Sequence, residues 1–222
     1  MAKQVEMTSY SDPSYIPALG AHWLTPLYDP LQRWVMRDEQ FKRRLIVQAN
    51  VQPAQHVLDL GCGTGTLTIQ VKRAQPLARV TGLDPDPEVL AMAHAKSVKA
   101  GAAINVVQGL ADALPYPSNV FDRVLSSLVL HHLTRDQKQS ALDEFVRVLK
   151  SAGQLHVADF GKPHNVYGRI LGSVMQRFET VSDNVRGRLP QLFYGAGLKH
   201  VEETARITTL FGTLSLYRAQ KP

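Results

Sequence analysis

The sequence is poor in cysteine and has no long apolar run. Its 222 residues include one cysteine, Cys62, which can form neither an internal disulfide nor a cysteine-rich metal site. We therefore expect a reducing, cytoplasmic environment. No apolar run approaches the ~18 residues that a membrane-spanning helix needs, and the first residues lack the apolar segment of a secretory signal. No histidine or cysteine cluster has metal-ligand spacing, so we expect no metal site.

Runs of basic residues interleaved with aromatic residues are also missing, so we expect no nucleic-acid partner. The net charge is nevertheless +6, and residues 162–222 hold most of the excess, with nine basic and four acidic residues. This excess is compatible with a solvated basic face or with peripheral contact to a membrane surface. The sequence offers no basis for inferring a protein partner.

A glycine-rich turn, GCGTG, occupies residues 61–65. The apolar run Val57–Leu60 before it predicts a buried strand, and Leu67 and Val71, four residues apart, predict a helix directly after it. A strand, a tight glycine turn and a helix open a nucleotide-binding βαβ unit, because glycines let a ligand approach the backbone closely. The alternative is a βα turn that binds nothing.

Two acids near this turn indicate which ligand it takes. Asp59, at the tip of the predicted strand, would repel a pyrophosphate but suits an ammonium group, and Thr66 replaces the third glycine of a dinucleotide fingerprint. S-adenosylmethionine carries an ammonium group, and its carboxylate can bind N–H groups at the helix start. Asp84 follows Gly65 by 19 residues, close to the ~20 expected for an acid that binds ribose hydroxyls. Both adenosine cofactors use such an acid, so Asp59 and the missing third glycine are the features that favour S-adenosylmethionine over the alternative, an NAD-dependent oxidoreductase.

Four segments in order resemble the motifs of class I S-adenosylmethionine-dependent methyltransferases: VLDLGCGTG, GLDPDPEVL, LPYPSNVFDRVLSSLVLHHL and FVRVLKSAGQLHVADF. The resemblance covers residues 55–160 and is nearest to the small-molecule group that includes the quinone-biosynthesis C-methyltransferases. It implies an α/β, doubly wound, mostly parallel seven-stranded sheet of the Rossmann-like methyltransferase type. It also implies S-adenosylmethionine as cofactor and a small-molecule acceptor.

The chain divides into two predicted parts, the second of which includes a cover. Residues 1–50 form an N-terminal arm and helix that serve as a lid, residues 51–222 form the cofactor-binding domain, and residues 162–197 within it form a helical cover. Strands alternate with helices up to Phe160, which predicts a parallel sheet with helices on both faces. Strand five is expected to begin at Gly153.

Past Phe160 the pattern becomes helical. An amphipathic helix is predicted from Val166 to Phe178. It either packs against the domain or serves as a substrate lid or a contact with lipid. A second helix is predicted over Val185–Ala196. Two closing strands, Lys199–Thr204 and Leu214–Arg218, pair antiparallel in the resembled family.

The resemblance adds residues to the cofactor site. Tyr28, followed by Asp29, stands where the family's arm closes over the cofactor. After the third strand, relatives carry an acid where this chain has Leu110, so Asp112 is a substitute candidate and the backbone of Ala111 an adenine contact. The complete set of candidate cofactor-binding residues is Tyr28, Asp59, Gly61, Cys62, Gly63, Gly65, Asp84, Pro85, Leu110, Ala111, Asp112 and Ser126.

Methyl transfer from a sulfonium is an in-line displacement, in which the protein aligns the reactants and removes a proton where the nucleophile requires it. His131, His132 and Asp159 follow predicted strand ends and are the candidate catalytic residues. The chain lacks the Asn and Trp-Lys signature that quinone methyltransferases carry after the Tyr-Asp pair. A phospholipid N-methyltransferase and a non-catalytic S-adenosylmethionine-binding module therefore stay open as alternatives.

Overall fold

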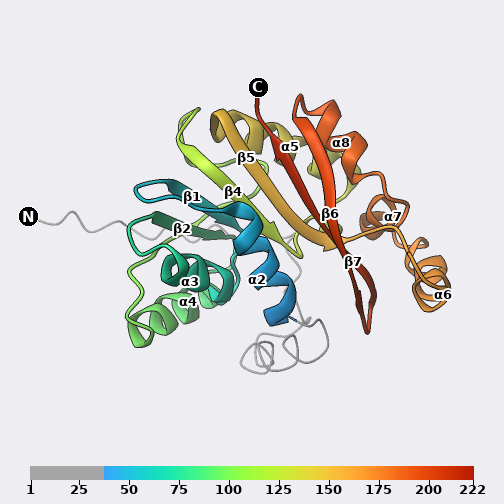
Figure 1. Ribbon diagram of the computed structural model, residues 1–222, viewed down its shortest axis with the longest axis horizontal. Helices are drawn as coiled ribbons and strands as arrows, with labels where there is room; N and C mark the ends of the chain where they lie inside the picture. Colours follow the sequence, from blue (N-terminus) through green and yellow to red (C-terminus); the bar gives the residue numbers. More distant parts are fainter. Residues whose placement is uncertain (1–37) are drawn as a thin grey trace, which may run out of the picture.

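The computed structural model describes residues 38–222, and the predicted arm with Tyr28 lies outside the described residues. A seven-stranded sheet forms the centre of the molecule, in the order β3-β2-β1-β4-β5-β7-β6 (Figure 1). The first five strands run parallel, and β7 pairs antiparallel with both β5 and β6. The predicted doubly wound, mostly parallel α/β fold is confirmed. The strands are β1 His56–Leu60, β2 Arg79–Asp84, β3 Asn105–Gln108, β4 Phe121–Ser127, β5 Leu149–Phe160, β6 Lys199–Thr209 and β7 Gly212–Gln220.

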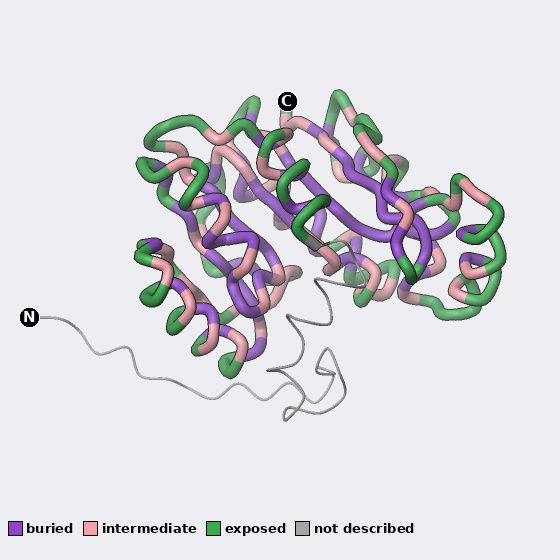
Figure 2. Tube along the Cα trace, turned by 60° about the horizontal axis from the view of Figure 1, so that its bottom comes forward, coloured by how far each residue is buried: buried purple, intermediate pink, exposed green. Residues whose placement is uncertain are grey.

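Helices cover both faces of this sheet. The helical elements are α2 Asp38–Ala49, α3 Thr66–Ala74, α4 Pro87–Lys99, the 3-10 turn η2 Leu130–His132, α5 Arg135–Val148, α6 Val166–Met175, α7 Glu179–Val185 and α8 Leu189–Gly195. One hydrophobic core joins the sheet to α2 and α3, and a second joins it to α5 and α8. Figure 2 shows the strands buried between exposed helical surfaces. Among residues 38–222, no helix combines the length and apolar character needed to cross a bilayer.

Side-chain alternation along the strands places two acids on opposite faces of the sheet. Val57 packs in the core with α2 and α3, and Asp59, two residues later on β1, projects to the same side. Val157 packs in the core with α5, and Asp159, two residues later on β5, projects to that opposite side. Each acid lies near the carboxyl end of its strand, where doubly wound sheets bind ligands.

Local capping explains where two of the helices begin. The Asp86 side chain accepts a hydrogen bond from the Glu88 N–H at 2.8 Å, with Pro87 at the first position of α4. Thr134 and Gln137 form a capping box at the start of α5.

Strand five begins at Leu149, so its predicted start at Gly153 was wrong. Its register against β4 shifts, with Leu149 opposite Phe121 and Gln154 opposite Arg123. A bulge of this kind lets the strand continue through a glycine that would otherwise mark its edge.

The C-terminal boundaries also differ from the prediction. The helix from Val166 ends at Met175 rather than Phe178, because Phe178 is extended and begins the separate helix α7. Gly187, with φ +72°, then separates α7 from α8, where one helix over 185–196 was predicted. The closing strands are longer than expected and meet in a two-residue turn at Leu210 and Phe211. Helices α6 to α8 lie within the proposed cover.

Candidate functional site

The three glycines of the turn serve different purposes. All have positive φ, +63° at Gly61, +51° at Gly63 and +73° at Gly65. A Cβ at Gly61 would lie 2.3 Å from a Val129 methyl, and one at Gly65 would lie 2.9 Å from the Ala93 Cβ. At Gly63 a Cβ would meet nothing within 4 Å. Packing therefore requires two of the glycines, while the third presents bare backbone to open space.

Cys62 holds the turn to the next strand. Its N–H donates to the Leu83 carbonyl at 3.0 Å, and its buried side chain packs so closely on Gly82 that a Cβ there would lie 2.8 Å from Sγ. Burial, together with the nearby charges of Asp59 and Asp84, raises the pKa of the thiol. The thiol is therefore protonated, and Cys62 shapes the turn rather than acting as a nucleophile.

Asp84 closes the turn from the tip of β2. One carboxylate oxygen accepts from the Gly63 N–H at 2.9 Å, and the other accepts from the Asp86 N–H at 3.1 Å. Burial raises its pKa to about 6, although these two hydrogen bonds act in the opposite direction. Pro85, next in the chain, is half-buried. The predicted ribose-binding acid thus lies directly beside the glycine that faces open space.

Asp59 is fully buried and only partly satisfied. Thr68 on α3 donates to Oδ2 at 2.6 Å, whereas Oδ1 has no hydrogen-bond partner among residues 38–222. Burial raises the pKa of Asp59 to about 7, against the lowering effects of the Thr68 hydrogen bond and the Lys42 charge. Buried polar atoms normally have partners, so this oxygen is suited to a donor on a cationic ligand.

The remaining predicted cofactor residues lie on two neighbouring segments. The Gly109 N–H donates to the Asp84 carbonyl at 3.2 Å, which places the half-buried Leu110 and Ala111 next to that acid. Asp112 is exposed on the same loop. Ser126, near the end of β4, is fully buried, and its hydroxyl has no partner within the described chain.

These features fit S-adenosylmethionine. The open backbone at Gly63 admits a ligand, and the unpartnered Asp59 oxygen and Ser126 hydroxyl offer an acceptor and a polar contact near strand ends. Asp84 retains lone pairs for hydroxyl donors after its two backbone hydrogen bonds. Within residues 38–222, no group of three or more His, Cys, Asp or Glu side chains is placed to hold a metal ion.

A second cluster lies at the ends of β4 and β5. His131 Nδ1 is 2.9 Å from Asp159 Oδ1, and the His131 N–H donates to Oδ2 at 3.4 Å. Although burial raises the pKa of Asp159, the His131 charge and hydrogen bond lower it overall, so the acid is a carboxylate. A carboxylate only accepts hydrogen bonds, so His131 Nδ1 carries the shared proton, and in the neutral tautomer with this arrangement the lone pair is on Nε2.

Two residues that sequence reasoning missed support this pair. The Asn184 amide of α7 donates to Asp159 Oδ1 at 3.0 Å. Lys138 is fully buried, and its ammonium donates to the Leu133 carbonyl at 2.8 Å and to the Thr180 carbonyl, which ties the histidine loop to α7. Lys138 lies four residues before Leu142, on the apolar stripe of α5, and this position is the sequence feature from which its burial could have been predicted.

His132 does not join the pair in the same way. It is exposed, its ring centroid lies 4.0 Å from that of His131, and within the described chain it makes no side-chain hydrogen bond to Asp159. The three predicted catalytic residues are therefore neighbours, but only His131 and Asp159 form a hydrogen-bonded unit.

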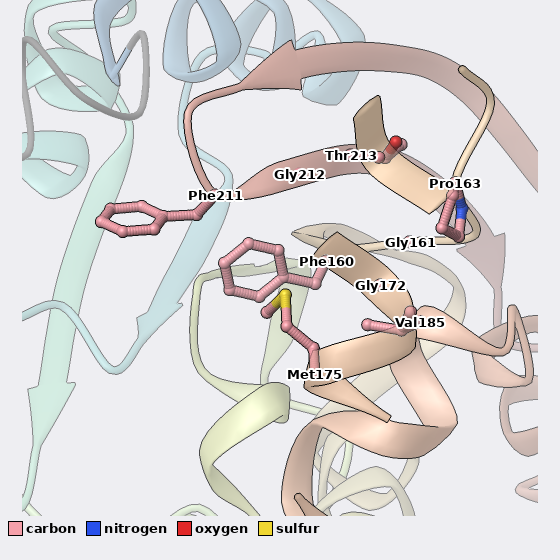
Figure 3. A pocket seen from close by; sticks show the side chains of 10 residues that line it. Phe160, Gly161, Pro163, Gly172, Met175, Val185, Phe211, Gly212 and Thr213 are labelled. Atoms are coloured by element: carbon pink, nitrogen blue, oxygen red, sulfur yellow. The ribbon is translucent and has the colours of Figure 1, made fainter. Parts of the chain in front are cut away.

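A small apolar pocket begins one side chain away from His131. The Phe160 ring packs edge-on against the His131 ring, with centroids 4.8 Å apart, and also lines a pocket of about 180 Å³, part of it open to solvent. Figure 3 shows the Phe160 ring beside the Met175 thioether, with Phe211 on the hairpin turn above. The pocket is lined by Phe160, Gly161, Pro163, Gly168, Gly172, Met175, Val185, Phe211, Gly212 and Thr213. The enclosed space within it is only about 10 Å³, room for about one water molecule, so the pocket offers apolar contact surface rather than space for a ligand.

Comparison with known proteins agrees with this geometry. Residues 57–153 match the family model described as a methyltransferase domain. The chain is 37% identical over 144 residues to an uncharacterized methyltransferase of Synechocystis, covering 64% of this chain and 65% of that relative, just under two thirds. It is 32% identical over 157 residues to a demethylmenaquinone methyltransferase of Thermus thermophilus, covering 69% of this chain and 70% of that relative.

The fold is likewise similar to solved structures. An S-adenosylmethionine-dependent methyltransferase from Aquifex aeolicus superposes with a TM-score of 0.64 at 18% identity, covering 96% of this chain and all of that one. At this identity the likeness concerns the fold alone.

Proposed function

The chain belongs to the class I S-adenosylmethionine-dependent methyltransferases, and we propose that His131 is the base with which it methylates a small, amphipathic acceptor. The cofactor of this family is S-adenosylmethionine, which supplies an electrophilic methyl group on a sulfonium when bound. The observation that carries the proposal is the 2.9 Å hydrogen bond between His131 and Asp159 at the ligand edge of the sheet.

In this proposal the glycine turn and its acids hold the cofactor. Gly63 offers backbone to the ligand, Asp84 accepts from the ribose hydroxyls, and Asp59 Oδ1 accepts from the ammonium group. The backbone at Ser126 supports the methionine end, and Ala111 and Leu110 border the adenine. Asp112 is exposed, which makes it the weakest member of the proposed set.

His131 acts on the acceptor. With Nδ1–H directed at Asp159, Nε2 can take a proton from a carbon or phenol nucleophile as it attacks the methyl group. Asp159 then stabilises the imidazolium that results and keeps the ring in place. The side chain of His131 is 15% exposed, so an acceptor in the crevice can reach it.

The best candidate acceptor is a quinol-like ring with an apolar tail. The Thermus relative is a demethylmenaquinone methyltransferase, and the pocket beside Phe160 provides apolar surface next to the base. Phospholipid N-methylation is the second candidate, favoured by the basic residues 162–222. Either acceptor calls for peripheral membrane contact of a cytoplasmic protein. In this proposal residues 1–50 act as the lid and residues 51–222 form the cofactor-binding domain. Residues 162–197 within that domain form the cover.

The test measures methyl transfer from labelled S-adenosylmethionine in three reactions. One contains a prenylated hydroquinone, one contains phosphatidylethanolamine, and the control contains no acceptor. We expect demethylated cofactor to accumulate with the hydroquinone, and the H131Q variant to bind the cofactor but to transfer methyl about 10²–10⁴-fold more slowly. Product with phosphatidylethanolamine alone would favour the second candidate. Cofactor binding with no product from any acceptor would instead indicate a binding module without catalysis.

A further inference from the structure

Exposed apolar side chains gather at one end of the molecule. Of the eleven large hydrophobic residues that are exposed within residues 38–222, seven lie on or just after α6 or at the β6–β7 turn. Ile170 is 67% exposed, Phe178 62% and Leu210 60%. Single exposed apolar residues are ordinary on protein surfaces, but a contiguous group marks an interaction site.

These residues lie on two elements that are in contact. Figure 1 shows α6 and the β6–β7 turn at the same end of the molecule, and the Tyr167 hydroxyl of α6 donates to the Leu210 carbonyl of the turn. Along α6 the exposed residues repeat every four positions, as a helix face requires. We name this group the apolar surface; besides Tyr167 it comprises Val166, Ile170, Val174, Phe178, Leu210 and Phe211.

Basic residues border the apolar surface. Arg169 and Arg177 are exposed, lie in the helical row next to Ile170 and Val174, and make no ion pair within the described chain. Lys162 and Arg186 are exposed near the two ends of the α6–α7 segment.

Other arginines of the C-terminal region differ, because each pairs with an acid: Arg188 with Asp183, Arg206 with Glu203 and Arg218 with Glu202. Helix α6 itself contains no acid, and Glu179 is the exposed acid that follows it. The charge that surrounds the apolar surface is therefore net positive and not neutralised internally.

We infer that the apolar surface binds an anionic lipid bilayer, with α6 lying in the headgroup region. An amphipathic helix with aromatic and aliphatic side chains on one face and arginines at its edge has this chemistry. The positive border complements anionic headgroups, and each basic residue near such a membrane strengthens binding by about fivefold. A protein partner of unspecified charge would not require the border to be basic.

The apolar surface also joins the pocket beside the proposed base. Phe211 is 49% exposed on the surface and lines the pocket together with Phe160, whose ring contacts His131. In the proposed function, an acceptor held in the bilayer would approach His131 from this side of the molecule. This route rests on the proposed function, whereas binding to the bilayer can be measured without methyl transfer.

The test is co-sedimentation of the full chain with phosphatidylcholine vesicles, with and without phosphatidylglycerol. We expect at least about tenfold stronger binding to the anionic vesicles. The double variant I170E/F178E should lose about tenfold or more of this binding, and R169Q/R177Q should weaken binding to anionic vesicles only, by about fivefold per arginine. The matched control is V98E, which changes a residue that is 68% exposed on α4 and should bind as the wild type does.

Three results would overturn the inference. One is equal binding to neutral and anionic vesicles, and another is wild-type binding by I170E/F178E. The third is a dimer in solution that I170E/F178E converts to a monomer, because the apolar surface would then join two copies of the chain. H131Q should bind vesicles normally. Vesicle binding without methyl transfer to any acceptor would therefore contradict the proposed function alone, and methyl transfer without vesicle binding would contradict the membrane inference alone.

Discussion

Asp59 on β1 and Asp159 on β5 are both fully buried near the carboxyl edge of one sheet, but their partners differ. Asp59 receives one side-chain hydrogen bond, from Thr68, and its other oxygen is unpartnered in the described chain. Asp159 receives hydrogen bonds from His131, from the Phe160 N–H and from Asn184. Accordingly, the pKa of Asp59 is raised to about 7 by burial, while that of Asp159 lies below its usual range because its partners outweigh burial.

This difference separates two uses of a buried acid. An acid whose partners are incomplete carries an energetic cost that a cationic ligand can relieve, so Asp59 is suited to binding. An acid whose partners are complete is fixed, so Asp159 is suited to orienting the side chain that it holds. The two acids face opposite sides of the sheet, and in the proposed function Asp59 binds the cofactor while Asp159 orients the base.

The largest expected effect concerns the base. We expect H131Q to lower kcat by about 10²–10⁴-fold, because proton removal is lost, with cofactor affinity unchanged. The matched control is H132Q, which changes the exposed neighbour and should keep kcat within about tenfold of wild type. Steady-state kinetics with the accepted substrate measure both, and equal losses in the two variants would remove His131 from its special role.

The second effect is on stability, and its sign follows from the raised pKa of Asp59. A folded-state pKa of about 7, above the ordinary 3.8, contributes stability that is present at low pH and lost as pH rises through 7. D59N lacks this ionisation. We therefore expect the free energy of unfolding of D59N, relative to cofactor-free wild type, to rise by about 3 kcal/mol between about pH 5 and pH 8.

Denaturant unfolding at several pH values measures this difference. The comparison between variants is needed because other groups oppose the trend: burial lowers the pKa of His156 to about 3, which favours folding as pH rises through the ordinary histidine range. His156 is present in both proteins, so its contribution cancels. If the difference in free energy of unfolding between D59N and wild type did not change with pH, Asp59 would not titrate between about pH 5 and pH 8 in the folded protein, and the prediction would be wrong.

The third effect contrasts the two acids in binding. We expect D59N to weaken S-adenosylmethionine binding by about 10–100-fold, the range for a hydrogen bond to a charged group. D159N should change this affinity by less than about twofold while lowering kcat, because the histidine loses its orienting carboxylate. Calorimetry of each variant measures the affinities, and a larger loss in D159N would reverse the assignment of the two acids.

The smallest effect tests the open backbone at Gly63. Gly63 and Gly101 both have positive φ, and a Cβ at either would meet nothing within 4 Å. G63A and G101A should therefore lose similar stability, about 1 kcal/mol each, from backbone strain. Only G63A should weaken cofactor binding, by about tenfold, because only its methyl would occupy the ligand's approach. Equal affinity in the two variants would place the ligand elsewhere.

Element boundaries were less predictable than element types. The bulge in β5 carries the strand back from Gly153 to Leu149, since pairing with β4 outweighs the local glycine signal. Helix α6 ends before Phe178 because that residue adopts an extended conformation. Both outcomes depend on neighbours distant in sequence, which local periodicity does not contain.

By itself, the sequence determined the glycine turn, the acids at the tips of the first two strands and the alternation that builds the sheet. Each of these depends on residues close together in the chain, where spacing and side-chain chemistry are sufficient. Only the tertiary structure decided that His131 pairs with Asp159, that Lys138 and Asn184 support this pair, and that α6 meets the β6–β7 turn. Those contacts join residues brought together by strand order and packing, so their partners are defined by the fold and not by spacing along the chain.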